Sequence, residues 1–501
     1  MKHYWISAIA LFAAFSTQAD DLLQVYHQAL NSDPIFAQAE STWHSQQMNL
    51  PIARASYLPQ LGMTGSAVRD YSTVSPSYYQ FGPSYSWEYA YGLTLTQPIF
   101  NYAAWSQIKG ADATVKSATA TYFAAQQSLM QRVAQAYFAV LQAYDQLRYT
   151  IANKRAVWEQ YLTAREQFRV GLIAITDEYD ARSKYDQVVA QQISAQNNLN
   201  VQIENLRAIT GQSYPSLKGL GKHLPLLAPV PNNMRQWVNI AEKQNYGLQA
   251  QNYSVIAAMD TIKQEAAGGY PTLSLTGTGT QTRQDAQSGS AQPSVITSQV
   301  DLGLQLAYNP IQGGLVRAST EQARYNYKTA VGLLEQTHRG VIDDTRTSFL
   351  GVLSYANQVK ADEQSIISAK KAVAATEAGF KVGTRTMVDV LLDLTALYQS
   401  QQQHANDEYS YINNLIALKA AAGTLSLEDL KHINAWLQGE IHFPDQIAGT
   451  EIPKENNHEI IFPGEANKNK SVKHKRTRSK HSQKKAQATT LVKSLSLPVP
   501  R

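Results

Sequence analysis

The feature that most constrains this chain is the length of its stretches without helix breakers. No proline occurs between Pro98 and Pro215, a stretch of 116 residues, or between Pro310 and Pro444, a stretch of 133. Positions 111–170 also lack glycine and are rich in alanine, glutamine, leucine and arginine. These residues are good helix formers. The sequence therefore predicts a helix from about 102 to 168, roughly 100 Å long at 1.5 Å per residue, which is typical of elongated scaffolds.

A second constraint is an internal repeat with a period of 212 residues. Leu58-Pro59-Gln60-Leu61 returns as Tyr270-Pro271-Thr272-Leu273, and Phe168-Arg169-Val170-Gly171 returns as Phe380-Lys381-Val382-Gly383. Such self-similarity indicates one structural unit used twice. We predict a first repeat at 20–220 and a second at 231–430, followed by a C-terminal equatorial segment at 431–465. The second long helix is expected at about 315–379, and shorter returning helices at about 176–210 and 387–422.

The period of the hydrophobic pattern changes ahead of each long helix. From Ser86 to Thr96 every odd position is large and apolar or aromatic, and Val300 to Tyr308 also alternates. This period of two is typical of strands with one apolar face. We predict strands within 60–98 and 271–309, joined by loops around 73–84 and 284–296. A half-buried soluble sheet would show the same alternation, but four strands of one chain cannot close a sheet in lipid, so several chains would have to share it.

The N-terminus predicts export. Lys2, an apolar run from Tyr4 to Phe15 and a small residue, Ala19, before Asp20 form the pattern of a signal peptide over 1–19. Other apolar runs are too short for a spanning helix. The expected location is therefore outside the cytoplasm.

Charge is distributed unevenly along the chain. The net charge is +5, yet residues 466–501 carry 11 Lys or Arg and no acidic residue. Residues 20–465 then hold 32 basic and 39 acidic residues, a net of −7. We interpret 466–501 as a disordered basic tail that either contacts anionic lipid or peptidoglycan or is dispensable. The acidic body argues against a nucleic-acid partner.

Motifs for enzymatic chemistry are missing. The chain has no cysteine, and its 11 histidines include no pair with the spacing of a metal site. There is no P-loop, no nucleophile elbow and no dinucleotide fingerprint. We therefore expect no enzyme activity, no cofactor and no bound metal.

Several stretches together resemble the TolC family of outer-membrane efflux and secretion channels, over about residues 21–430. They are Leu58-Pro59-Gln60-Leu61-Gly62, residues 170–177, Gln312-Gly313-Gly314 and residues 377–391. The resemblance implies an α+β membrane protein, in which four strands from each of three chains form a 12-stranded outer-membrane β-barrel above a periplasmic tunnel of long helices. It also implies docking of a periplasmic adaptor and an inner-membrane pump of the RND, ABC or MFS type. The implied function is a passive exit duct for drugs, toxic compounds or secreted proteins; an exported coiled-coil tether or adhesin is the alternative.

The resemblance also implies which residues close the duct at its periplasmic end. Arg385 would bond Asp177 of a neighbouring hairpin, with Glu166 and Thr176 nearby, although a solvated surface pair worth about 0 to 1 kcal/mol is the simpler reading. Phe380 replaces a family tyrosine, so we expect closure to depend more on the Arg385–Asp177 pair. The first turn is more apolar, which predicts a packed first hairpin and a movable second one.

A carboxylate ring is the last implied feature. Asp389 matches one family ring position, while the second position holds Leu392 and the nearest carboxylate is Asp393. Rings of carboxylates favour cations and bind multivalent cations.

Overall fold

The computed structural model describes residues 19–72, 84–221, 224–285 and 293–443. The predicted signal peptide at 1–19, apart from Ala19, lies outside the described residues, as do the basic tail at 466–501, residues 444–465, and most of the loops at 73–84 and 284–296. Among the described helices, none combines the length and the apolar character that a membrane-spanning helix needs.

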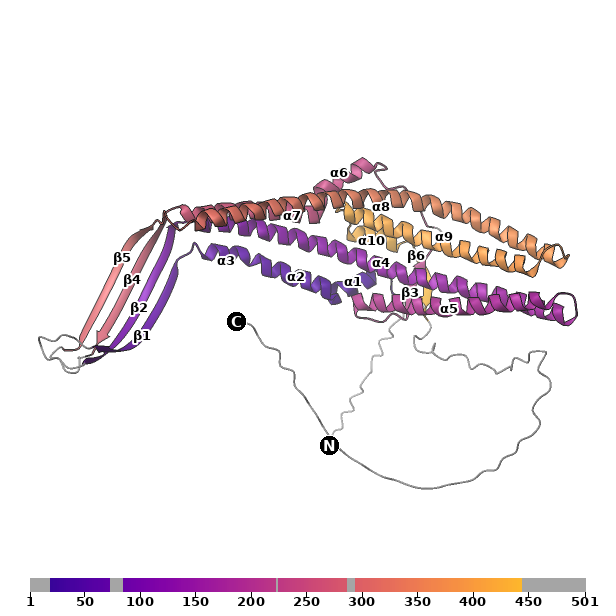
Figure 1. Cartoon of the computed structure of the whole chain (residues 1–501), viewed down its shortest axis with the longest axis horizontal. Coiled ribbons are helices and arrows are strands. Elements are labelled where there is room, and N and C mark those ends of the chain that lie inside the picture. The colour runs from indigo at the N-terminus through magenta and orange to yellow at the C-terminus, as the bar shows by residue number, and fades with distance from the viewer. Residues whose placement is uncertain (1–18, 73–83, 222–223, 286–292, 444–501) are drawn as a thin grey trace, which may run out of the picture. The chain divides into compact units, whose positions relative to one another are not determined.

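Two very long helices dominate the chain (Figure 1). Helix α4 covers Tyr102–Arg169 and helix α8 covers Leu315–Lys381, with 68 and 67 residues. At 1.5 Å per residue each is about 100 Å long. The returning helices are α5, Ile175–Thr210, and α9, Met387–Ala421. Each repeat therefore contains one helical hairpin, at the places where the pattern of breakers predicts it.

Shorter helices, which were not predicted from the sequence, precede the strands of each repeat. In the first repeat these are α1 (Leu22–Ser32), α2 (Pro34–Gln47) and α3 (Asn49–Ala55). In the second they are α6 (Met234–Gln244), α7 (Tyr246–Ala266) and the short 3-10 helix η1 (Ala267–Gly269). Most begin at an Asp or Asn whose side chain accepts a hydrogen bond from the first turn, as in the caps Asp33 and Asn245.

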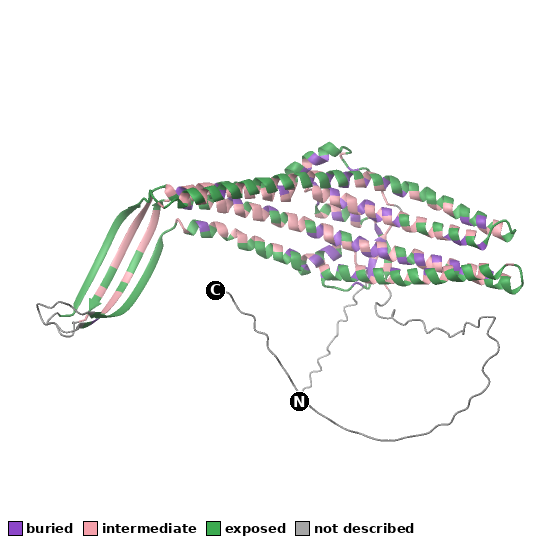
Figure 2. Ribbon diagram, in the orientation of Figure 1, coloured by how far each residue is buried: buried purple, intermediate pink, exposed green. Residues whose placement is uncertain are grey.

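Four strands form one antiparallel sheet in the order β1-β2-β4-β5. They are β1 (Gln60–Ser72), β2 (Ser84–Phe100), β4 (Thr272–Gln284) and β5 (Val295–Ala307). The two repeats meet in the centre, where Gly92 of β2 lies opposite Thr280 of β4. In the described part of the chain β1 and β5 each have one paired edge and one free edge, and every residue of β5 is exposed (Figure 2).

The main hydrophobic core lies among the helices and a second, two-stranded sheet. Strand β3 (Ser216–Leu220) pairs with β6 (Leu437–His442), so the end of the first repeat joins the segment after the second. Tyr137 and Phe138 of α4 are fully buried against Tyr409 and Ile412 of α9. The Tyr137 hydroxyl also donates to the Lys218 carbonyl at 2.6 Å, which fixes α4 to β3.

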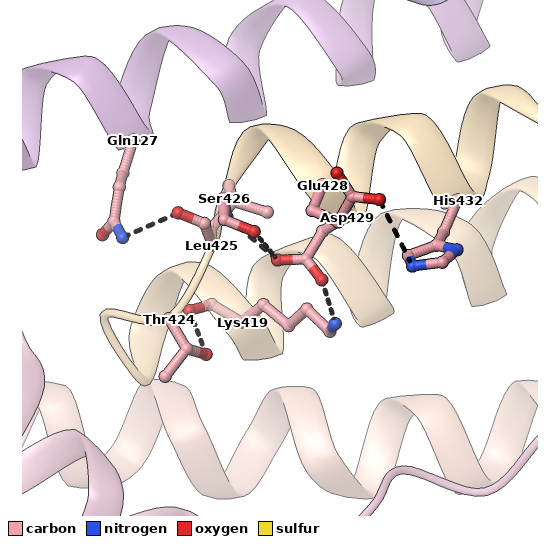
Figure 3. A network of polar contacts seen from close by, with 8 residues as sticks. All are labelled: Gln127, Lys419, Thr424, Leu425, Ser426, Glu428, Asp429 and His432. Atoms are coloured by element: carbon pink, nitrogen blue, oxygen red, sulfur yellow. Dashed lines mark hydrogen bonds and ion pairs between the residues drawn. The ribbon is translucent and has the colours of Figure 1, made fainter.

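Polar contacts fix the end of α9 and the following helix α10, Leu427–Asn434 (Figure 3). The Gln127 amide of α4 donates to the carbonyls of Gly423 and Leu425 at 2.9 and 3.0 Å. Asp429 accepts from the Ser426 amide at 2.9 Å and forms an ion pair with Lys419. These bonds hold the chain where it leaves the second hairpin.

Candidate functional site: the two hairpin turns

The first turn (residues 170–174) and the second turn (residues 382–386) have the same backbone geometry. Gly171 and Gly383 adopt φ values of +79° and +77°, a region that glycine enters without strain. The Leu172 amide donates back to Gln167 O and the Thr384 amide to Gly379 O, each at 2.9 Å. Both long helices thus end in a glycine-based cap, and the Val-Gly pairs of the sequence explain it.

The helices that follow the turns begin differently. Thr386 caps α9: its hydroxyl accepts from the Asp389 amide at 3.3 Å, and its own amide donates to the Asp389 carboxylate at 3.0 Å. These hydrogen bonds lower the pKa of Asp389. Helix α5 starts after Ala174, which has no side chain able to cap, and Asp177 lies in the first turn of this helix.

Burial also separates the two returning helices. In α9 the first turns bury Met387, Val390, Leu391 and Leu394. The positions 212 residues earlier in α5 hold Ile175, Glu178, Tyr179 and Arg182, none of which is buried. Met387 is 0% exposed whereas Ile175 is 41% exposed. Over its first eight residues α9 thus buries four apolar side chains, whereas α5 buries only Ala181.

This difference corrects the expectation of a packed first turn. Leu172 is 74% exposed and Val170 is 62% exposed, so in a single chain the apolar side chains of the first turn lie largely in solvent. Among the described apolar residues of the first turn, only Ile173 packs against a buried cluster. The apolar composition of the first turn therefore did not predict its exposure in the single chain.

Two small hydrophobic clusters hold the second hairpin against the first. One joins Val157 and Ala164 of α4 to Met387 and Leu391 of α9, together with Ala181 and Val188 of α5. The other joins Val373 of α8 to Val390 and Leu394 of α9 within the second hairpin, and the partly buried Ala156 of α4 packs against it. Phe380 packs against both clusters. A phenyl ring is suited to this place, since the buried members of both clusters are apolar.

The predicted polar gate residues are not brought together within one chain. Arg385 and Thr176 are exposed, and in the described ranges no ion pair joins Arg385 to Asp177. Glu166 is already paired with Arg169 of its own helix at 2.8 Å. Asp393 accepts a hydrogen bond from the Thr376 hydroxyl of α8. Within the described chain these polar residues stay apart, and the contact between Arg385 and Asp177 remains a prediction.

Sequence reasoning missed a group of titratable residues midway along α4, α8 and α9. The Tyr409 hydroxyl donates to Asp145 at 2.7 Å, and Arg148 pairs with Asp145 at 3.0 Å. Burial raises the pKa of Glu408 to about 7, with help from the charges of Asp145 and Glu363. The sequence signal was present, because the corresponding positions of the first repeat hold Gln196 and Asn197 in place of Glu408 and Tyr409.

Nearby groups extend this titratable region toward α8. Asp407 is almost fully buried and accepts from Gln403 at 3.0 Å. Burial and the neighbouring Asp407 raise the pKa of Asp362 to about 6. His404 lies 3.5 Å from Glu408, and burial lowers its pKa. Within the described residues no group of three or more such side chains is arranged to hold a metal ion.

Comparison with known proteins agrees with this architecture. The family model described as "Outer membrane efflux protein" matches residues 25–212 and 237–424, two segments offset by 212 residues. Outer membrane protein TolC of Escherichia coli (strain K12) is 35% identical over 449 residues, covering 88% of this chain and 90% of the relative. Alkaline protease secretion protein AprF of Pseudomonas aeruginosa is 26% identical over 425 residues, covering 84% and 88%.

Solved structures share the fold. The Campylobacter jejuni CmeC outer membrane channel superimposes with a TM-score of 0.69 at 18% identity, covering 84% of this chain and 90% of that chain. The Vibrio cholerae outer membrane protein VceC gives 0.69 at 18% identity, covering 80% and 96%. The fold class and the two-fold repeat predicted from the sequence are confirmed.

Proposed function

Since this chain belongs to the outer membrane efflux protein family and is an outer-membrane exit duct rather than an enzyme, we propose that its two hairpin turns gate the periplasmic entrance of a homotrimer. The observation that carries this proposal is the packing of the two hairpins. Apolar residues at the start of α9 are buried between the helices, whereas the polar residues of the turns are exposed to solvent. Membership of an efflux family argues against the alternative of a tether or adhesin without a pore.

The free edges of the sheet support a trimer. Strands β1 and β5 each pair on one side only in the described chain, and a sheet in lipid must close on itself because unpaired backbone groups are costly there. Three chains of four strands would make twelve. Exposed apolar residues on β5, among them Val300 and Leu302, would then face lipid.

The names of the relatives suggest the cargo, and the exposed apolar residues of the turns suggest where a partner docks. Two relatives, AprF and PrtF, are named for protease secretion, and one, BepC of Brucella suis, is named for efflux. We propose that this duct serves tripartite efflux pumps, type I secretion systems or both, conducting drugs, toxic compounds or proteins. The exposed Val170, Leu172 and Val382 are a suitable surface for a periplasmic adaptor that links the duct to an inner-membrane pump of the RND, ABC or MFS type.

The gate itself would have an apolar and a polar component. Within each chain, Phe380 and the clusters around Met387 hold the two hairpins together. Between chains, Arg385 would pair with Asp177, with Thr176 beside it. Glu166 would contribute less, since Arg169 already neutralises it.

Conductance of single channels in planar bilayers tests the polar component. Arg385→Ser should raise the conductance of the closed duct, because it removes the cation that joins neighbouring turns. Lys381→Ser is the matched control, since Lys381 is an exposed cation near the same turn. Equal conductance of Arg385→Ser and the parent protein would refute the polar gate.

Asp389 would form a carboxylate ring just inside the entrance and give the duct a preference for cations. Asp393 would add a weaker ring, because the Thr376 hydroxyl already engages it. Asp389→Asn removes the charge but keeps an oxygen that can accept from the Thr386 amide. Block by a trivalent cation should weaken in this variant, and unchanged block would exclude Asp389 from the ring.

A further inference from the structure

A groove beside the membrane-spanning strands combines cationic and apolar side chains. Helices α3, α4 and α7 line it, with Arg54, Lys109, Leu50, Ile108, Tyr253 and Ile256 among the lining residues. Helix α4 begins two residues after β2 ends, and Lys109 is its eighth residue. At 1.5 Å per residue, Lys109 lies about 10 Å along the helix from its start. The groove is therefore at the level where the headgroups of the periplasmic leaflet meet the helices, if the strands span the hydrocarbon core.

The carboxylates of this groove are already neutralised. Asp112 pairs with Lys116 at 2.8 Å, and the buried Asp260 pairs with Lys263 at 2.7 Å. Neither Arg54 nor Lys109 forms an ion pair with a carboxylate anywhere in the ranges that the structure describes. The groove thus presents two cations that are available to an anionic ligand.

Exposed apolar surface adjoins these cations. Ile256 lines the groove and is itself exposed, and Leu50 and Ile108 are half-buried beside it. The Lys109 ammonium lies 3.6 Å from the centre of the Trp105 ring, which is 46% exposed. A tryptophan with a basic residue next to a membrane span is the arrangement that anchors proteins at the headgroup level.

The second repeat provides an internal comparison. A groove at the start of α8 contains Ala266 and Glu321 at the positions that correspond to Arg54 and Lys109. Its Arg324 is paired with Glu321. Arg317 also lines the second groove and has no ion-pair partner among the described residues. The second groove therefore has one free cation where the first has two, and the two-cation site would belong to the first repeat.

We propose that the groove between α3, α4 and α7 binds the phosphate headgroup of an anionic phospholipid from the periplasmic leaflet. Arg54 and Lys109 would hold the phosphate through charge-assisted hydrogen bonds. Ile256 and Leu50 would contact the glycerol and the first methylenes of the acyl chains. This inference rests on the proposed function in one respect, that the strands span the outer membrane.

Native mass spectrometry of the purified full chain in neutral detergent tests the site. Phosphatidylglycerol, as the anionic probe, should bind the parent protein more tightly than phosphatidylcholine does. A basic residue near an anionic lipid surface contributes enough to change affinity about fivefold. The double variant Arg54→Gln/Lys109→Gln should therefore bind phosphatidylglycerol roughly 25-fold more weakly, with phosphatidylcholine binding unchanged.

A control of equal charge is available in the second repeat. Arg317→Gln/Lys328→Gln removes two exposed cations near the start of α8 and should keep the affinity of the parent protein. The inference is overturned if the first double variant keeps its preference for phosphatidylglycerol, if the control loses it equally, or if inorganic phosphate displaces the lipid completely. Flotation with phosphatidylcholine vesicles separates the two proposals: failure to float refutes spanning strands, while flotation without lipid preference refutes only the headgroup site.

Discussion

The two hairpins share their turn geometry but differ in what their returning helices contact. Gly171 and Gly383 end the long helices in the same left-handed conformation, because the local Val-Gly sequence is the same. Downstream, α9 has a cap at Thr386 and a buried apolar face, and α5 has neither at the corresponding positions. The two repeats thus share the backbone geometry of their turns, while their returning helices α5 and α9 differ in what they contact. We infer that α9 is held in place by packing, whereas α5 keeps a polar surface available to neighbouring chains.

Truncation of equivalent side chains at the starts of α9 and α5 should give the largest difference between the two hairpins. Met387→Ala removes a side chain that is fully buried, which typically costs about 2 to 5 kcal/mol. Ile175→Ala changes the equivalent, exposed position of the first repeat and should cost about 1 kcal/mol or less. Hydrogen exchange of the first turns of α9 and α5 measures both local stabilities. Equal losses in the two variants would mean that the hairpins are packed alike.

The titratable region midway along α9 predicts that the stability of this helix depends on pH. Burial raises the pKa of Glu408 from its ordinary 4.5 to about 7, so the native chain keeps a proton that the unfolded chain releases. Stability should therefore fall as the pH rises from about 4.5 to 7. Glu408→Gln, which introduces the residue found at position 196, should stabilise α9 by up to about 3 kcal/mol at pH 8 and little at pH 4.

Hydrogen exchange around residues 404–412, corrected for the intrinsic rate at each pH, measures this effect. Glu204→Gln is a suitable control, since Glu204 is an exposed residue of α5. A pH profile that Glu408→Gln leaves unchanged would contradict the assignment of the proton to this carboxyl.

These differences show how far the sequence alone can predict this protein. The long helices, the Val-Gly turns and the alternating strands depend on local composition and period, and the breaker-free and alternating stretches place them well. Burial of Met387 and the packing of the partly buried Phe380 depend on Val157 and Ala164, more than 200 residues away, so the local pattern could not reveal them. Comparison of the repeats could have indicated it, because α9 has Val390 and Leu394 where α5 has Glu178 and Arg182.

The site residues were predictable to a similar extent. Asp389 is equivalent to Asp177 by position, yet only Asp389 belongs to a capping box, because residue 386 is threonine and residue 174 is alanine. The contact between Arg385 and Asp177 stays a prediction, since it would join neighbouring chains. The short helices before the strands were missed because few turns of helix show a clear period, although their Asp and Asn caps were visible in the sequence.

Transfer of the cap between repeats is a smaller test. Thr386→Ala should destabilise the start of α9 by about 1 kcal/mol, the usual contribution of such a cap. Ala174→Ser should stabilise the start of α5 by about 0.5 to 1 kcal/mol, since it creates a Ser-x-x-Asp box with Asp177. Hydrogen exchange at the two helix starts measures both changes. A loss at α9 without a gain at α5 would show that the first turn cannot adopt the capped geometry.

The smallest expected effect concerns Glu166, whose position in the second repeat is occupied by Ala378. Its ion pair with Arg169 is exposed, and such pairs contribute about 0.3 to 0.5 kcal/mol within a helix. Glu166→Ala should therefore change the stability of the first hairpin by about 0.5 kcal/mol or less, and the conductance of the closed duct less than Arg385→Ser does. Thermal unfolding and planar-bilayer recordings measure the two. If Glu166→Ala opens the duct as far as Arg385→Ser, then Arg169 does not retain this carboxylate in the trimer, and Glu166 is a direct partner of Arg385 across the chain boundary.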